Sequence, residues 1–148
     1  MRQHAGNEGR VLIADDDLAI RHLVSTILQR EGLAFDSAAD GQEAIDKLEQ
    51  HSYAVVLLDL MMPRVDGFGV VEYLKANPPV TKPVVLVISA YADQKFKQVD
   101  ADVVAGVLRK PFEVGDLGNL VRLCVQGYEA ATRGRAIPDD LGELSVPN

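Results

Sequence analysis

One stretch of the chain, Tyr53–Leu58, constrains the fold more than any other. It holds six uncharged residues, mostly valine and leucine, and it runs directly into Asp59. A short apolar run of this kind is typical of a strand that is buried on both faces, as the central strands of parallel sheets are. Asp59 would then lie at the carboxyl end of this strand, on the edge where open α/β sheets bind ligands. Asp59 is therefore the first candidate for a functional residue.

Four other short segments have the residue pattern of strands, and helical patterns alternate with them. This alternation predicts right-handed βαβ units and a parallel sheet covered on both faces. For 148 residues we expect the flavodoxin-like (βα)5 doubly wound fold. Its strand order, 2-1-3-4-5, is that of known proteins with this architecture, and the residues alone do not determine it. The strands are predicted at 10–14, 34–38, 83–88 and 103–108, and the helices from Leu18 to Glu31, after Gly41, from Phe68 to Asn77, over 92–99 and over 113–128.

The length of the chain allows one domain with a proper core and is too short for two comfortable ones. We assign residues 10–128 to that domain. Residues 1–9 are polar and are expected to form a flexible N-terminus. Residues 129–148 are expected to form a tail or linker, because 134–148 contain two prolines and no apolar periodicity.

Composition excludes several functional classes. The formal net charge of -7 and the pI near 4.9 argue against unaided binding to nucleic acid, which needs a basic face. No apolar run reaches the ~18 residues of a membrane span, and the first nine residues lack the apolar middle of a signal peptide. The lone Cys124 can form no internal disulfide. We therefore expect a cytoplasmic protein without membrane insertion.

Polar residues stand where the predicted strands end. Asp15 and Asp16 close the first strand, Ser89 follows the fourth, and Lys110 follows the fifth. The first and third strands are neighbours in the expected order, so the carboxylates of Asp15, Asp16 and Asp59 should meet. Three such carboxylates repel one another, and a hard divalent cation with oxygen ligands, Mg²⁺, would relieve the repulsion. The ammonium group of Lys110 would offset part of the remaining charge.

This set of groups suits phosphoryl transfer. Asp59 can act as a nucleophile and form an acyl phosphate. The cation and Lys110 would neutralise charge on the phosphoryl oxygens, while Ser89 and backbone amides would donate hydrogen bonds to them. Taken alone, Asp15 to Asp17 could form only a loop with a helix cap, and Asp59 could be an ordinary acid at a strand end; Asp17 is expected to be the cap.

Four motifs, in order along the chain, carry a resemblance to a known family. They are Val11–Asp17, Leu57–Gly67, Ser89–Ala90 and Lys110–Phe112. Together, at matching strand ends, they resemble the receiver domain of the response regulators of two-component systems. The resemblance extends from about Arg10 to Gly127, which is most of the chain.

The resemblance implies a role for each residue of the predicted site. Asp59 would be the phosphoacceptor. Asp16 would bind Mg²⁺ directly and Asp15 would bind it through water. The backbone carbonyl group of Met61 would complete the protein ligands of the metal, together with Asp59.

By the same resemblance, Ser89 would supply the hydroxyl group that moves toward the phosphoryl group, and Lys110 the cation that contacts it. The donor would be a phosphohistidine on a sensor histidine kinase or a histidine phosphotransfer protein, or a small phosphodonor such as acetyl phosphate. The signal would leave by contact with a downstream effector protein. The chain would be a signalling module, not an enzyme, because its chemistry is its own phosphorylation and dephosphorylation.

Some positions differ from the usual receiver or suggest further roles. Val107 stands where receivers usually carry an aromatic residue that swings inward, which argues against that form of readout. Met61 and Tyr91 occupy positions that influence water attack on the acyl phosphate in this family, and we predict that they shield it. Leu123 and Val125 lie off the main inward stripe of the last helix. Either the tail or a broad core covers them, or they form a face for a partner or a weak homodimer.

Three other functions are open from sequence alone. A phosphatase of the haloacid dehalogenase type would be expected to carry a second acid two residues after the nucleophile, where this chain has Met61. A nucleotide- or flavin-binding module would be expected to carry a glycine-rich strand-to-helix loop, which this chain lacks. A receiver-like interaction module without phosphotransfer would not need competent residues at all five site positions.

Overall fold

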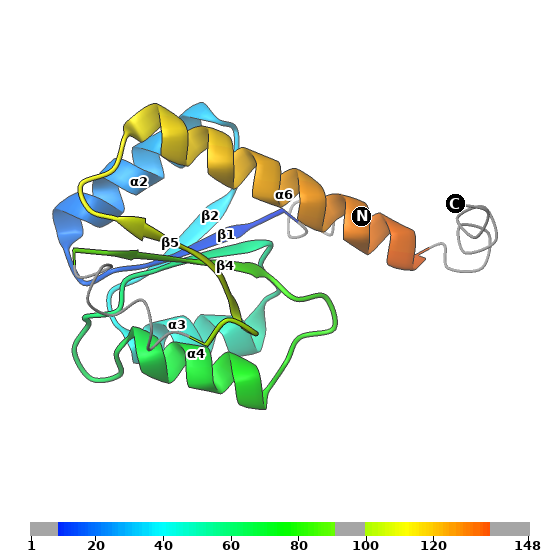
Figure 1. Ribbon diagram of the computed structural model, residues 1–148, viewed down its shortest axis with the longest axis horizontal. Coiled ribbons are helices and arrows are strands. Elements are labelled where there is room, and N and C mark those ends of the chain that lie inside the picture. The colour runs from blue at the N-terminus through cyan, green and yellow to red at the C-terminus, as the bar shows by residue number, and fades with distance from the viewer. Residues whose placement is uncertain (1–8, 91–99, 137–148) are drawn as a thin grey trace.

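The structure is a computed structural model, and it describes residues 9–90 and 100–136. Within these ranges, five parallel strands form one sheet in the order β2-β1-β3-β4-β5 (Figure 1). The prediction of a flavodoxin-like parallel sheet with strand order 2-1-3-4-5 is therefore confirmed. The strands are β1 (Val11–Ala14), β2 (Phe35–Ala38), β3 (Val55–Leu58), β4 (Val84–Ser89) and β5 (Val104–Arg109), and the described helices are α2 (Leu18–Arg30), α3 (Gly41–Gln50), α4 (Gly67–Ala76) and α6 (Val114–Ala136).

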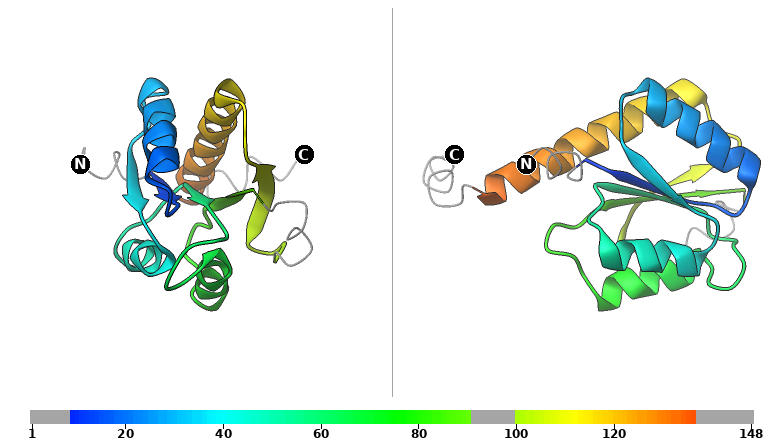
Figure 2. Two further views of the ribbon diagram at one scale, coloured as in Figure 1. Left: turned by 90° about the vertical axis from the view of Figure 1, so that its left-hand side faces the viewer. Right: turned by 180° about the vertical axis from the view of Figure 1, so that it is seen from behind.

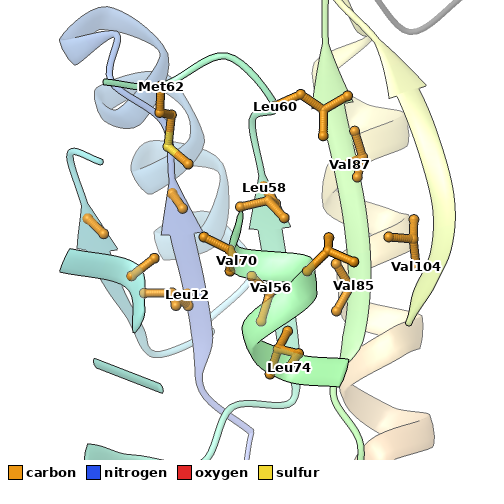
Figure 3. Close-up of a cluster of buried hydrophobic side chains, with 14 of the residues drawn as sticks. Leu12, Val56, Leu58, Leu60, Met62, Val70, Leu74, Val85, Val87 and Val104 are labelled. Carbon is orange, nitrogen blue, oxygen red and sulfur yellow. The ribbon is translucent and has the colours of Figure 1, made fainter. Parts of the chain in front are cut away.

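Helices cover both faces of the sheet. Helices α2 and α6 pack on one face, and α3 and α4 pack on the other (Figures 1 and 2). In β3, Val55 and Leu57 belong to the core beneath α2 and α6, whereas Val56 and Leu58 belong to the core beneath α3 and α4. Figure 3 shows Val56 and Leu58 beside Val70 of α4. A charge at any of these β3 positions would be buried without a partner, which explains the uncharged run before Asp59.

An aspartate caps each of the helices α2, α3 and α4. Asp17 caps α2, Asp40 caps α3 and Asp66 caps α4, and each side chain accepts a hydrogen bond from a backbone N–H group in the first turn. These carboxylates satisfy donors that the helix itself leaves without a partner. The role predicted for Asp17 is confirmed. Because these helices follow β1, β2 and β3, all three caps lie at the carboxyl edge of the parallel sheet.

Helix α6 is longer than the sequence pattern predicts. It ends at Ala136 and not at Tyr128, so the first residues of the predicted tail are helical. Glutamate, alanine and arginine are common beyond Tyr128, and these residues favour a helix without an apolar stripe. The last turns of α6 project beyond the sheet (Figure 1). No helix in the described part of the chain is long and apolar enough to cross a membrane.

The two residues proposed as a surface on this helix separate in the structure. Val125 is buried, with 3% of its surface exposed, whereas Leu123 is 59% exposed. Val125 therefore belongs to a broad core and not to a partner face, and only Leu123 remains a candidate. Val107 is partly buried against the core beneath α3 and α4. The predicted helix at 92–99, together with Tyr91, lies outside the described residues.

Candidate functional site

The backbone places two acids at the carboxyl edge of the sheet. The N–H group of Asp59 donates to the carbonyl oxygen of Ala14 over 2.9 Å, and that of Asp15 donates to the carbonyl oxygen of Ala38 over 3.1 Å. Hydrogen bonding between neighbouring strands thus continues one residue beyond β1 and β3. The edge faces the viewer in the left-hand view of Figure 2. The positions of both acids therefore follow from the pairing of the sheet and not from a mobile loop.

Three carboxylates meet at this edge. One carboxylate oxygen each from Asp15, Asp16 and Asp59 lies within 4.8 Å of the others. Asp15 and Asp59 are buried, and Asp16 is exposed. A set of oxygen donors with one side open to solvent fits Mg²⁺, which prefers oxygen ligands and keeps part of its water shell. The meeting of these three residues is the arrangement that the sequence predicts.

Lys110 brings a positive charge to the same place. Its Nζ atom donates to Asp15 Oδ2 over 2.8 Å and lies 3.8 Å from Asp59 Oδ2. Burial acts to lower the pKa of Lys110, but the hydrogen bond to Asp15 and the charges of Asp15 and Asp59 together raise the pKa above its ordinary value. Lys110 therefore stays protonated at neutral pH and can face an incoming anion.

The ionised form of the Asp59 carboxyl group is destabilised by its surroundings. Burial, followed by the charge of Asp15, raises the pKa of Asp59 to about 6. Lys110 and the N–H group of Met61 act in the other direction but do not cancel the shift. A cation bound between the acids would favour the ionised form of Asp59, because opposite charge stabilises a carboxylate.

Ser89 and Met61 complete the set of residues predicted from sequence. Ser89 is the last residue of β4 and is fully buried, and its carbonyl oxygen accepts a hydrogen bond from the backbone of Lys110 over 3.1 Å. Met61 lies two residues beyond Asp59, and its N–H group donates to Asp59 Oδ1 over 3.4 Å. Met61 is 47% exposed. Both residues therefore lie at the same edge as the acids.

The loop after β3 is anchored on both sides of Met61. Leu60 and Met62 are buried in the core beneath α3 and α4, at the end of the sheet that carries the loop (Figure 3). The N–H group of Gly67 donates to the carbonyl oxygen of Leu60 over 2.9 Å. A Cβ atom at Gly67 would lie 2.5 Å from the carbonyl oxygen of Asp59, so only glycine fits. The backbone at Met61 is therefore held between buried neighbours.

Sequence reasoning missed two arginines near the site. Arg21 of α2 donates from Nη1 to the carbonyl oxygen of Asp15 over 2.8 Å. Arg64, in the loop after β3, forms an ion pair with Asp40. The position of Arg21, one turn into the helix that Asp17 caps, was a signal for its contact with the end of β1. No pattern in the sequence points to the ion pair of Arg64 with Asp40.

Known proteins are similar to this chain over most of its length. The family described as the response regulator receiver domain matches residues 11–122. The transcriptional regulatory protein PdtaR of Mycobacterium tuberculosis is 35% identical over 137 residues, which cover 92% of this chain and 64% of PdtaR. The probable transcriptional regulator ycf27 of Porphyridium aerugineum is 29% identical over 131 residues, which cover 88% of this chain and 53% of ycf27. The chain thus spans about half to two thirds of the length of these regulators.

Solved structures extend the similarity to the fold. The chemotaxis response regulator CheY4 of Vibrio cholerae has a TM-score of 0.70 and 30% identity, and the match covers 78% of this chain and 97% of CheY4. TrrA of Thermotoga maritima, solved in complex with Mg²⁺ and BeF, has a TM-score of 0.69 and 27% identity, with coverage of 78% and 97%. The family match includes every residue that the structure gathers at the carboxyl edge. The chain therefore belongs to the response regulator receiver domains of two-component signalling systems.

Proposed function

We propose that this chain is a phosphoacceptor receiver that takes a phosphoryl group onto Asp59 with Mg²⁺ and signals by protein contact. One observation carries the proposal. Carboxylate oxygens of Asp15, Asp16 and Asp59 lie within 4.8 Å of one another, and the Nζ atom of Lys110 lies 3.8 Å from Asp59 Oδ2. A site for a hard cation beside an ammonium group suits the transfer of a highly charged phosphoryl group. The binding of Mg²⁺ and BeF by the similar protein TrrA supports the proposal.

The metal would be held by oxygen atoms alone. Asp16 and Asp59 would bind it directly, Asp15 would bind it through water, and the carbonyl oxygen of Met61 would complete the protein ligands. When bound, Mg²⁺ would neutralise charge on the phosphoryl oxygens. It would also lower the pKa of Asp59, which burial and then the charge of Asp15 raise in the metal-free protein.

The residues of the site divide the chemistry among them. A carboxylate oxygen of Asp59 attacks the phosphorus atom of a phosphohistidine, an O–P bond forms, and the P–N bond breaks. The electron pair of the broken bond stays on the imidazole nitrogen, which takes up a proton. The ammonium group of Lys110 balances the charge of the phosphoryl oxygens, and the hydroxyl group of Ser89 donates a hydrogen bond to them. The donor is a sensor histidine kinase or a histidine phosphotransfer protein.

Readout in this chain differs from an aromatic swing, because Val107 is a small aliphatic residue. We propose that movement of Ser89 toward the phosphoryl group changes the surface offered to a downstream effector protein. Ser89 is the last residue of β4, and its carbonyl oxygen accepts a hydrogen bond from the backbone N–H group of Lys110, so a shift at either residue affects the ends of both β4 and β5.

Incubation with acetyl phosphate and Mg²⁺, followed by intact mass measurement, tests the proposal. The wild-type protein should gain one phosphoryl group, and Asp59→Ala should gain none. Asp46→Ala, which removes an exposed acid from the surface of α3, is the matched control and should still gain one. A wild-type protein that gains nothing would be an interaction module. Steady hydrolysis of p-nitrophenyl phosphate without an adduct would indicate a phosphatase.

A further inference from the structure

Asp40 has two sets of hydrogen bonds, and only one of them belongs to its own helix. Its Oδ1 atom accepts from the N–H group of Glu43 over 2.9 Å, which is the cap of α3. Its Oδ2 atom accepts from Nε of Arg64 over 2.9 Å and also from Nη2 of Arg64. The carboxylate of Asp40 is buried, with 7% of the residue exposed, whereas Arg64 reaches it from the surface. Asp40 therefore links the start of α3 to the loop after β3.

The backbone of Arg64 has an unusual conformation. Its φ angle is +66°, and it is the single non-glycine residue with positive φ in the described ranges. This region is unfavourable for a residue with a branched or bulky side chain, and glycine or asparagine usually occupies it. An arginine at this position therefore requires a compensating interaction, and the two hydrogen bonds to Asp40 are that interaction.

A second contact joins the same two segments. The N–H group of Gly41 donates to the carbonyl oxygen of Val65 over 2.8 Å. A Cβ atom at Gly41 would lie 2.1 Å from that oxygen, so only glycine allows the approach. The loop is thus held against α3 at Arg64 and Val65, a few residues beyond Met61.

The segment from Ala38 to Gly41 also touches the other side of the metal site. The carbonyl oxygen of Ala38 accepts a hydrogen bond from the N–H group of Asp15 over 3.1 Å. One short segment therefore contacts both the strand end that carries Asp15 and the loop that carries Met61. The distance between Asp15 and the backbone of Met61 therefore depends on the contacts that hold the loop after β3 against residues 38–41.

We propose that the Asp40–Arg64 pair is a positioning clamp, which sets the place of the Met61 carbonyl group relative to Asp15 and thereby the affinity for Mg²⁺. This inference rests on the proposed function, because it assumes that the acids hold Mg²⁺. Neither Asp40 nor Arg64 touches the metal in this scheme. Residues that orient metal ligands from outside the ligand set commonly change metal affinity by about 10- to 100-fold.

The direction in which Arg64→Gln changes the Mg²⁺ affinity distinguishes the clamp from the effect of the arginine charge alone. Arg64→Gln removes a positive charge, and this alone should make a cation bind more tightly. Loss of the clamp should instead weaken Mg²⁺ binding, by about tenfold. Calorimetric titration of the full chain with Mg²⁺, without a phosphodonor, measures the affinity. Arg133→Gln is the control, because it removes the same charge from an exposed position on α6, and its affinity should stay within about twofold of the wild type.

Two more variants distinguish positioning from general damage to the fold. Arg64→Gly adopts positive φ freely, so its urea unfolding should stay close to that of the wild type while its Mg²⁺ affinity falls as in Arg64→Gln. Asp40→Asn keeps the cap of α3, because asparagine caps helices as well as aspartate does. The double variant Asp40→Asn with Arg64→Gln should bind Mg²⁺ no more weakly than Asp40→Asn alone, because either substitution by itself already removes the ion pair.

Mg²⁺ binding by Arg64→Gln that equals or exceeds the wild-type affinity would overturn the clamp. Additive losses in the double variant would overturn it as well. A wild-type protein that neither binds Mg²⁺ nor accepts a phosphoryl group would give a different result, since it would reject the proposed function itself and the clamp with it.

Discussion

Asp59 holds a negative charge in a place that the fold makes unfavourable. Burial and the charge of Asp15 raise the pKa of Asp59 to about 6 in the folded protein. In an unfolded chain an aspartate titrates near pH ~4. Because the folded state has the higher pKa, it binds the proton more tightly, and the stability of the protein depends on pH through this group. Asp59, the proposed phosphoacceptor, is therefore also a source of instability in the metal-free protein.

The first prediction concerns this group. The favourable contribution of protonated Asp59 is fully present below the unfolded pKa and is lost as the pH rises through about 6. In the metal-free protein at pH ~8, Asp59→Asn should therefore raise the free energy of unfolding by about 1–3 kcal/mol, and the gain should disappear near pH ~4. Urea denaturation in the presence of EDTA at both pH values measures the difference.

A matched control separates burial from the chemistry of the substitution. Asp66→Asn makes the same exchange at the exposed cap of α4, where asparagine also caps, and it should change stability by less than about 0.5 kcal/mol. An Asp59→Asn protein that is less stable than the wild type at the higher pH would show that ionised Asp59 does not destabilise the folded state.

The second prediction concerns the lifetime of the phosphoryl group. Met61 is about half exposed, and its backbone N–H group donates to Asp59 two residues earlier in the chain. An asparagine there can orient a water molecule, so Met61→Asn should lose its phosphoryl group several-fold faster than the wild type. Intact mass at intervals after removal of acetyl phosphate follows the loss.

Val80→Asn is the control for this experiment, because Val80 is 82% exposed in the loop between α4 and β4, outside the site. Its rate of loss should equal that of the wild type. If Met61→Asn and the companion variant Tyr91→Glu both keep the phosphoryl group as long as the wild type or longer, the shielding role is excluded.

At the residue scale, the sequence predicts where a residue lies in the fold better than which side chain it pairs with. The meeting of Asp15, Asp16 and Asp59 follows from strand ends in a parallel sheet, and the structure places them together. The pair of Asp40 and Arg64 could not be predicted, because it joins residues far apart in sequence and depends on a positive φ angle. Shifted pKa values are equally hidden, since they depend on burial that the sequence does not give.

At the scale of elements, a clear apolar pattern made prediction reliable and polar helices made it fail. Strand β3 was predictable because both of its faces are buried and no charge is tolerated there. The last turns of α6 were not, because residues beyond Tyr128 have helix propensity but no apolar stripe facing a core. For Val125 the sequence left a broad core and a partner face open, and the structure supports the broad core, since the sheet covers a wider part of α6 than a narrow stripe suggests.

Helix α6 also gives the third prediction, which compares two glycines. Gly127 lies in the interior of the helix, and a Cβ atom there would meet nothing within 4 Å. Gly127→Ala should therefore raise the free energy of unfolding by about 0.5–1 kcal/mol. At Gly118 the same atom would lie 3.0 Å from Glu31 Oε2 and 3.3 Å from Ile27 Cγ2.

Gly118→Ala should consequently gain less than Gly127→Ala, or destabilise the protein, because crowding against α2 offsets the gain in helix propensity. Thermal unfolding of both variants beside the wild type measures the order. If Gly118→Ala proved the more stable of the two, the packing of α6 against α2 would be looser than the structure indicates.

At the scale of the whole molecule, metal binding, protonation and stability are linked. A ligand that binds only the folded state raises its stability, and a metal held by carboxylates competes with protons for them. The fourth prediction is that Mg²⁺ raises the midpoint of thermal unfolding at pH ~8 by several degrees but has a much smaller effect at pH ~5, where Asp59 is largely protonated. Asp16→Asn should lose most of the effect at the higher pH.

Differential scanning fluorimetry with Mg²⁺ at both pH values provides the measurement, with Na⁺ at equal ionic strength as the control. An equal rise for Mg²⁺ at both pH values would mean that the cation binds away from Asp59. An equal rise for Na⁺ would mean that the effect is one of general charge screening.

The aspartate caps of α2, α3 and α4 have a consequence for the order in which the molecule meets its ligands. A helix begins with a partial positive charge, which elsewhere in proteins attracts phosphate. Here the starts of α2, α3 and α4 at this edge are already neutralised by their own aspartates. Among the described residues of the site, Lys110 supplies positive charge for an incoming anion and a bound divalent ion would add to it, against the carboxylates of Asp15, Asp16 and Asp59. We therefore expect Mg²⁺ to bind before the phosphodonor, because without the cation the three carboxylates of the site would repel phosphate.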